Sequence, residues 1–136
     1  MTTYAAFVTA ISELTITGVN RMIDSTPESI AAADLPFQFV RLPEGDFAPS
    51  PASCLETGKT RSLDLVVCIE PVGLNIASQN FDDTVAMMDY VETALDAWNI
   101  APAQNGLIVE YSMVAGGEDV GDASYWAVVA TVTITG

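Results

Sequence analysis

The chain contains no histidine among its 136 residues. Histidine is the usual general base near neutral pH and the commonest protein ligand of transition metals, so its absence removes both kinds of site. Serine triads of the ordinary kind and zinc peptidase sites are therefore excluded. The glycine pair Gly116-Gly117 is followed neither by the Lys and Ser/Thr of a phosphate-binding loop nor by a dinucleotide fingerprint. We expect no enzyme activity and no cofactor.

Basic residues are scarce: 4 Lys and Arg stand against 18 Asp and Glu, for a formal net charge of −14. This balance excludes nucleic-acid binding through a broad basic surface and disfavours contact with anionic membranes. Two interpretations of the excess of acidic residues remain open. It keeps the protein soluble, or it provides a surface past which DNA slides without binding.

Charged residues of either sign are also few, at 16% of the chain, against about 25% in an ordinary soluble domain. Half of the residues are hydrophobic (50%), which is ample for one packed core and predicts a single domain over residues 1–136. A small domain of this composition exposes many Ala, Thr, Ser, Val and Gly side chains. Such surfaces are often buried against partners, so we expect an oligomer.

The two cysteines, Cys54 and Cys68, are too few for a disulfide framework and match no metal-binding spacing. We expect free thiols, because a Cys54 nucleophile would lack a histidine partner. The first residues, Met1 to Tyr4, contain neither a basic region nor a long apolar run. We therefore expect no signal peptide, and no stretch approaches the ~20 apolar residues of a membrane span.

A first helix is predicted over residues 3–23, where apolar side chains recur at spacings of three and four. Thr2 or Thr3 is a suitable cap. Gly18 and the β-branched residues between Leu14 and Thr17 weaken its second half. A short helical turn is expected to open at Pro27.

A second and stronger helix is predicted over residues 80–98, with Asn80 as its N-cap. Asp82 and Asp83 suit the positive end of the helix dipole, which explains this carboxylate pair better than catalysis does. The apolar stripe along this helix predicts a face buried in the core, formed by Phe81, Val85, Met88, Val91, Leu95 and Trp98.

Alternating apolar and polar residues predict four strands, at residues 37–42, 60–70, 107–114 and 125–135. A long irregular stretch, 43–59, separates the first two. An acidic loop, 115–124, joins the last two as a hairpin. The resulting order is helix-strand-strand twice, α-β-β-α-β-β. It predicts an α+β fold with two helices packed on one face of a mostly antiparallel sheet.

The chain has four basic residues, and each is a candidate for an ion pair. Arg21 and Arg41 are expected to neutralise carboxylates within the fold. Lys59 and Arg61 end the long stretch, and rare cations in an acidic oligomer suit contacts between subunits. Ordinary surface ion pairs of little energy explain them equally well. With Phe47 and Arg41, they are our candidates for a subunit interface.

Three carboxylates in the predicted hairpin loop, Glu118, Asp119 and Asp122, are candidates for a partner face. Their oxygens suit a hard cation such as calcium, but their spacing is not that of an EF-hand. A solvated hairpin tip is the better explanation, and we expect no metal site.

The arrangement resembles the tail terminator proteins of long-tailed bacteriophages, also called tail-to-head joining or tail completion proteins. The likeness covers nearly the whole chain and consists of element order, size and the Asp34-Leu35-Pro36 stretch. The segment from Tyr4 to Arg21 resembles their first helix, and the connector from Pro27 to Pro36 leads into a strand that begins Phe37-Gln38-Phe39-Val40. A long loop, a strong strand, the helix 80–98 and a closing hairpin complete the likeness.

The resemblance implies a structural virion protein that is assembled in the host cytoplasm. Such proteins form a hexameric ring on the end of the tail tube, end its polymerisation and offer a docking face to the head connector, while DNA passes through the hole without specific binding. It implies the tube protein and a head-completion or connector protein as partners, and makes the acidic hairpin a candidate for the lumen. Two alternatives remain: another neck or minor tail protein, or a small ligand-binding module with a pocket lined by Met88, Trp98 and Trp126.

Overall fold

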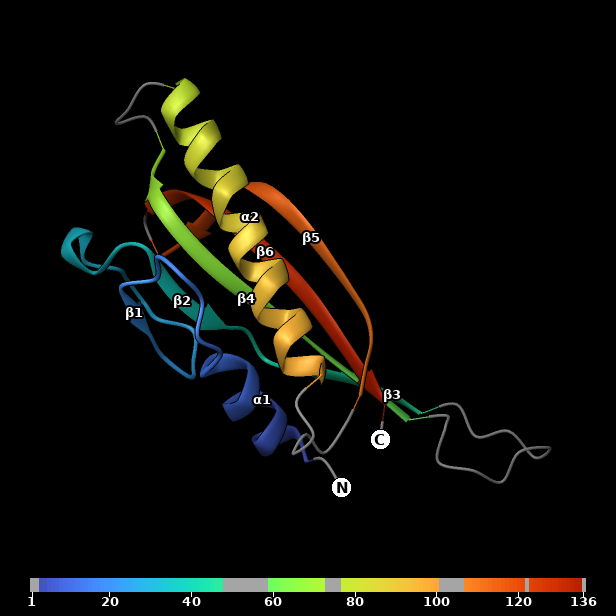
Figure 1. The fold of residues 1–136 in the computed structure, drawn as a ribbon. Coiled ribbons are helices and arrows are strands. Elements are labelled where there is room, and N and C mark those ends of the chain that lie inside the picture. Colours follow the sequence, from blue (N-terminus) through green and yellow to red (C-terminus); the bar gives the residue numbers. More distant parts are fainter. Residues whose placement is uncertain (1–2, 48–58, 73–76, 101–106, 122, 136) are drawn as a thin grey trace.

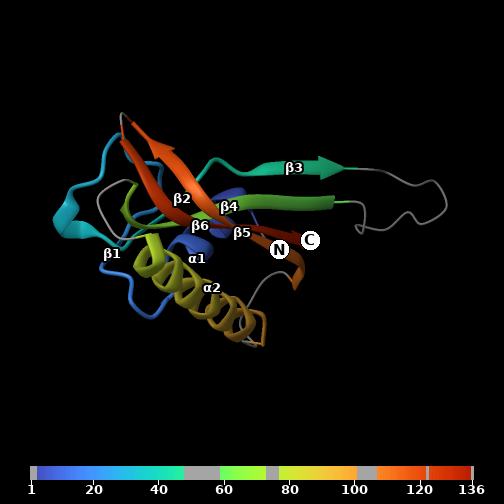
Figure 2. The same ribbon diagram turned by 90° about the horizontal axis from the view of Figure 1, so that it is seen from above.

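The computed structural model describes residues 3–47, 59–72, 77–100, 107–121 and 123–135. These residues form an α+β fold in which α-helices cover one face of a six-stranded, mostly antiparallel sheet (Figures 1 and 2). The helices are α1 (Tyr4–Ser12) and α2 (Ala77–Ile100), and a 3-10 turn spans Ala32–Asp34. The strands are β1 (Arg21–Met22), β2 (Phe37–Val40), β3 (Glu44–Phe47), β4 (Lys59–Pro71), β5 (Leu107–Val120) and β6 (Ala123–Thr135).

The sheet has the order β1-β2-β4-β6-β5, and β3 pairs with β4. β1 and β2 are parallel, and the other pairs are antiparallel. Four strands therefore lie between the helices, so the predicted order α-β-β-α-β-β is wrong. β1 has only 2 residues and β3 is a 4-residue Glu-Gly-Asp-Phe segment. Neither is long enough to show the alternation that identifies a strand.

Both helices pack on the same face of the sheet and share the main core with it (Figure 2). The predicted alternation of the central strand is confirmed: Leu63, Leu65 and Val67 point into this core, and Val66 and Cys68 point to the opposite face. Other members of the main core include Phe7 and Ile11 of α1, Val91 and Leu95 of α2, and Val128, Ala130 and Val132 of β6. β4 therefore contributes side chains to both cores, one from each of its faces.

The first helix is shorter than the predicted 3–23, because it ends at Ser12. Thr3 is its N-cap, as expected, and accepts a hydrogen bond from the Ala6 N–H at 3.1 Å. Beyond the helix, the buried side chain of Gln38 donates through Nε2 to the carbonyls of Ser12 and Leu14, both at 3.1 Å. Gly18 then adopts a φ of +87°, which a helix cannot contain. Tertiary contacts therefore replace the helix over this β-branched stretch.

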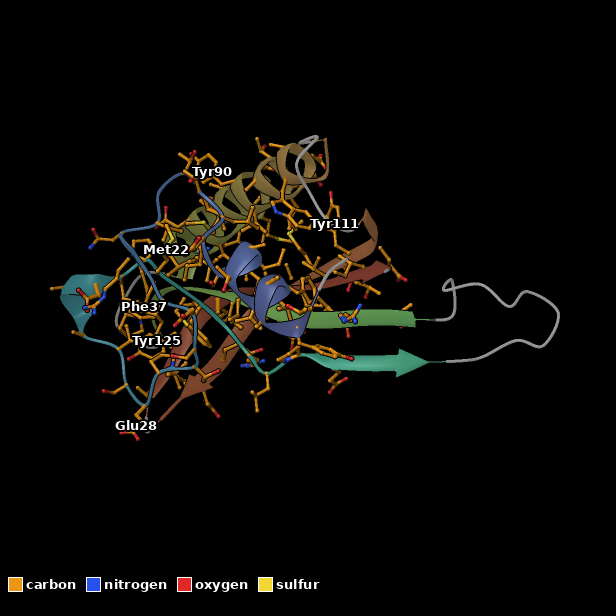
Figure 3. The ribbon with its side chains drawn as sticks, turned by 90° about the horizontal axis from the view of Figure 1, so that it is seen from below. Met22, Glu28, Phe37, Tyr90, Tyr111 and Tyr125 are labelled. Carbon is orange, nitrogen blue, oxygen red and sulfur yellow. The ribbon has the colours of Figure 1, made fainter. Side chains whose placement is uncertain are left out.

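The second face of the sheet is partly closed by the β5–β6 hairpin, which bends over it (Figure 2). Near the hairpin tip, Val120 and Tyr125 pack with Ile30, Phe37 and Phe39 in a second core. The Tyr125 hydroxyl donates to the Ile30 carbonyl at 3.2 Å, and Figure 3 shows Tyr125 and Phe37 gathered at this end of the molecule.

The predicted acidic loop 115–124 is consequently wrong. β5 continues to Val120, which pairs with Ala123 at the start of β6. The sequence does not show this part of the strand. Gly116 and Gly117 have no side chains, and the acidic residues Glu118 and Asp119 that follow have a low strand preference. The short helical turn expected at Pro27 is also wrong, since the 3-10 turn lies at Ala32–Asp34.

The second helix begins at Ala77, so Asn80 lies inside it and is not the N-cap. Val91 and Leu95 of the predicted stripe are buried, and Met88 and Trp98 pack against the core. Phe81 and Val85 are not core residues: they are 68% and 43% exposed. The end of the β5–β6 hairpin bends away from α2, to the far side of the sheet (Figure 2).

Candidate functional site: the interaction surfaces

The predicted interface candidates fall largely on one two-stranded ribbon, β3–β4. Phe47 pairs with Lys59, and Gly45 pairs with Arg61, in its antiparallel ladder. Phe47 therefore lies at the end of a strand, where the sequence predicted an irregular stretch. The ribbon projects beyond both helices (Figures 2 and 3). Among the described strands β3 pairs with β4 alone, so its other edge is open.

Arg61 forms no ion pair within the described residues. Its guanidinium carbon lies 4.9 Å from the ring centroid of Tyr4, a cation–π contact from the start of α1. The same tyrosine covers Gly45, where an added Cβ would collide with its hydroxyl. Nε and Nη1 of Arg61 are buried and have no hydrogen-bond acceptor in the described part of the chain. The guanidinium is thus held at the ribbon with part of its hydrogen-bonding capacity unused.

Arg41 joins the end of β2 to the outer face of the sheet. Its Nη2 lies 3.1 Å from Glu118 Oε2, and its Nη1 lies 3.7 Å from Asp64 Oδ2. Arg21 pairs with Asp34 at 3.1 Å. Both arginines therefore neutralise carboxylates within the fold, as the sequence indicated. Arg41 and Glu118, which were assigned to two different surfaces, contact each other in one subunit.

The other two acidic candidates for a partner face are Asp119 and Asp122. Asp119 accepts a hydrogen bond from the Ser124 hydroxyl across the hairpin. Asp122 lies outside the described residues. No group of three or more His, Cys, Asp or Glu side chains that could hold a metal ion occurs in the described part of the chain. The exposed Asp82 and Asp83 lie within α2, beyond its first turn.

Cys68 is a free, buried thiol in the second core. Burial raises its pKa to about 12; the charge of Glu118 adds to the rise and that of Arg41 opposes it. A thiol with so high a pKa holds almost no thiolate at neutral pH and is a poor nucleophile. Cys54, the other predicted free thiol, lies outside the described residues.

The pocket predicted from Met88, Trp98 and Trp126 is divided in the structure. Met88 and Trp98 pack against the main core. Trp126 instead lines an open groove of about 310 Å³ between α2 and the β5–β6 hairpin, together with Phe81, Thr84, Val85, Ala115 and Gly116. The groove could not be predicted from the sequence, because Phe81 and Val85 belong to the same apolar stripe of α2 as the buried Val91 and Leu95.

The chain matches no protein-family model and no curated protein. No helix in the described ranges is long and apolar enough to cross a membrane.

Proposed function

We propose that this protein is a structural virion protein that forms a ring on the end of a phage tail tube. The ring ends tube polymerisation and joins the tail to the head connector, and it acts without catalysis or cofactor. The observation that carries the proposal is the β3–β4 ribbon, a projecting strand pair with one open edge and the residues Phe47, Lys59 and Arg61. The resemblance to tail terminator proteins supplies the tail, the connector and the sixfold ring.

The placement of the open edges favours a ring over a simple dimer. β3 pairs on one side of β4, and β5 ends the sheet beyond β6 on the other side. A ring needs two different surfaces on each subunit that meet head to tail. An open strand edge is suited to such a contact because it can extend pairing into a neighbouring chain. We place one half of the subunit contact on the ribbon.

The chemistry of the ribbon fits an acidic neighbour. Arg21 and Arg41 already face carboxylates of their own subunit. Lys59 and Arg61 share the ribbon, in a chain that carries a net charge of −14. A cation that meets a carboxylate of the next subunit would fix the register of the contact. The excess acid elsewhere suits a hole through which DNA passes without binding.

Replacement of both ribbon cations tests the contact. The wild-type protein should form a ring whose mass rises to a fixed multiple of the subunit in light scattering. Lys59→Glu with Arg61→Glu should shift it toward the monomer, because the ribbon would then repel its neighbour. Arg21→Glu is the control, since Arg21 faces Asp34 of its own subunit. An unchanged mass for the double variant would remove the ribbon from the interface.

Electron microscopy of purified tail tubes with added protein distinguishes a terminator from another neck or minor tail protein. A terminator should appear as a ring on one end of the tube and should stop further growth when tube subunits are added. Tubes that keep growing, or protein that binds elsewhere on the particle, would contradict the terminator role.

A further inference from the structure

The groove between α2 and the hairpin exposes apolar side chains that helices normally bury. Phe81 is 68% exposed and Val85 is 43% exposed, and both line the groove with Trp126 of β6. A Cβ added at Gly116 would meet nothing within 4 Å, so no side chain of the described residues lies against this point of β5. An exposed phenylalanine beside an open apolar hollow is a common feature of a binding surface.

The rim of the groove is acidic. Residues of an α-helix are about 100° apart around its axis, so Asp82 and Asp89 lie on the same side of α2 as Val85. Both carboxylates are exposed, and the sequence of α2 contains no Lys or Arg. By the same geometry Asp83 lies on the other side of the helix.

Further along α2, acidic residues also lie next to β5. The Tyr111 hydroxyl of β5 donates to Asp96 Oδ1 of α2 at 3.0 Å. The pKa of Tyr111 is raised by burial, by this hydrogen bond, and by the charges of Asp96 and Glu92. Carboxylates of α2 therefore lie against β5 at Tyr111 as well as beside the groove.

We propose that this groove binds an extended segment of another protein, with one large apolar side chain next to Lys or Arg. The apolar side chain occupies the hollow against Phe81, Val85 and Trp126. The cation lies on the rim of the groove, in the field of the carboxylates of Asp82 and Asp89, which are about 10 Å apart along the helix axis. β5 is an edge strand among the described strands, so the same segment can pair with its free backbone edge.

Charge selects a different protein over a second copy of this chain. A second copy brings a further net charge of −14 to an already acidic rim. Its Arg21 and Arg41 are paired with its own carboxylates, which leaves two cations, Lys59 and Arg61 of the ribbon, against that net charge. A partner with locally basic sequence gains from the same field that repels a second copy. This inference goes beyond the proposed ring and does not depend on it.

A displayed library of random linear peptides, selected on the wild-type protein, tests the proposal. The enriched peptides should share one large apolar residue with Lys or Arg within a few positions. A synthetic peptide of the enriched sequence should bind with an affinity that falls as salt rises. Phe81→Ala with Val85→Ala should weaken its binding roughly tenfold or more. Both side chains are exposed, so the fold should persist, and circular dichroism checks it.

The charge component has its own matched pair of variants. Asp82→Asn with Asp89→Asn should weaken peptide binding several-fold and flatten its salt dependence, whereas Asp83→Asn should change neither. The proposal is overturned if no peptide is enriched, if the enriched peptides lack basic residues, or if they bind the Phe81/Val85 variant equally well. Self-association that the Phe81/Val85 variant abolishes would instead assign the groove to a second copy. Since peptide binding is measured whatever the oligomeric state, failure here leaves the ring proposal standing.

Discussion

Cys68 lies where the second core meets the charged outer face of the sheet. It is fully buried, and Glu118 and Arg41 both act on its thiol. Its pKa is about 12 in the folded protein, against 9.0 for the free side chain. The unfolded chain therefore loses this proton first as the pH rises. The contribution of Cys68 to stability should be intact below pH 9 and should be lost progressively between pH 9 and about 12.

Urea unfolding of a Cys54→Ser variant, compared with the same variant carrying Cys68→Ala, measures this effect because Cys68 is then the thiol that differs. The protein that keeps Cys68 should lose more stability between pH 9 and about 11 than the one that lacks it. Iodoacetamide should also leave Cys68 unmodified at pH 8 until urea unfolds the protein. Rapid alkylation of the native protein would show that the thiol is accessible.

At the scale of the elements, the end of the β5–β6 hairpin is held by its turn. Gly121 has a φ of +60°, and a Cβ there would collide with the Glu28 carbonyl oxygen. Figure 3 shows Glu28 near this end of the molecule. Gly121→Ala should destabilise the protein by about 2 kcal/mol, from the left-handed backbone and the displaced contact. It should thereby loosen the second core around Val120.

Gly117→Ala is the matched control in the same hairpin, because a Cβ at Gly117 meets nothing within 4 Å. Chemical denaturation of the two variants should separate them clearly, with Gly117→Ala close to the wild type. Equal stabilities for both would mean that the hairpin tip does not rest on the 28–30 segment.

The sequence predicted those helices and strands in which the periodic pattern of apolar residues is long enough to be recognised. β4 and β6 are each 13 residues long and place apolar side chains alternately on two faces of the sheet, so both strands are visible in the sequence. β3 and the outer half of β5 were missed, because glycine and acidic residues carry little strand preference. The predicted first helix is too long because the apolar spacing continues past Ser12. In the structure, Gln38, which is distant in sequence, donates hydrogen bonds to the Ser12 and Leu14 carbonyls that a longer helix would have used.

The candidate surfaces show the same division. Rarity of cations pointed to Lys59 and Arg61, and the fold places both on one ribbon. No local pattern could show that Arg41 and Glu118 meet, because 77 residues separate them along the chain. Phe81 and Val85 fit the apolar stripe of α2, but in the structure both are exposed beside the groove. Periodicity identifies the buried side of a helix, whereas the extent of the opposing sheet decides how much of it is covered.

At the scale of the whole molecule, charge sets the condition under which a ring can close. Each subunit carries −14, so neighbours repel over the whole circumference, whereas the proposed attraction is confined to the ribbon and its cations. Screening acts over a Debye length of about 10 Å at 0.1 M salt and about 3 Å at 1 M. Added salt therefore weakens the long-range repulsion more than it weakens strand pairing and apolar contacts at the ribbon.

The ring should accordingly form at lower protein concentration as sodium chloride is raised from about 0.02 M to about 0.5 M. Light scattering across a dilution series at each salt concentration measures the change. The Lys59→Glu/Arg61→Glu variant should need more salt than the wild type to reach the same mass, because it adds repulsion at the contact itself. A ring that dissociates as salt rises would show that ion pairs, and not backbone pairing or apolar contact, hold the subunits together.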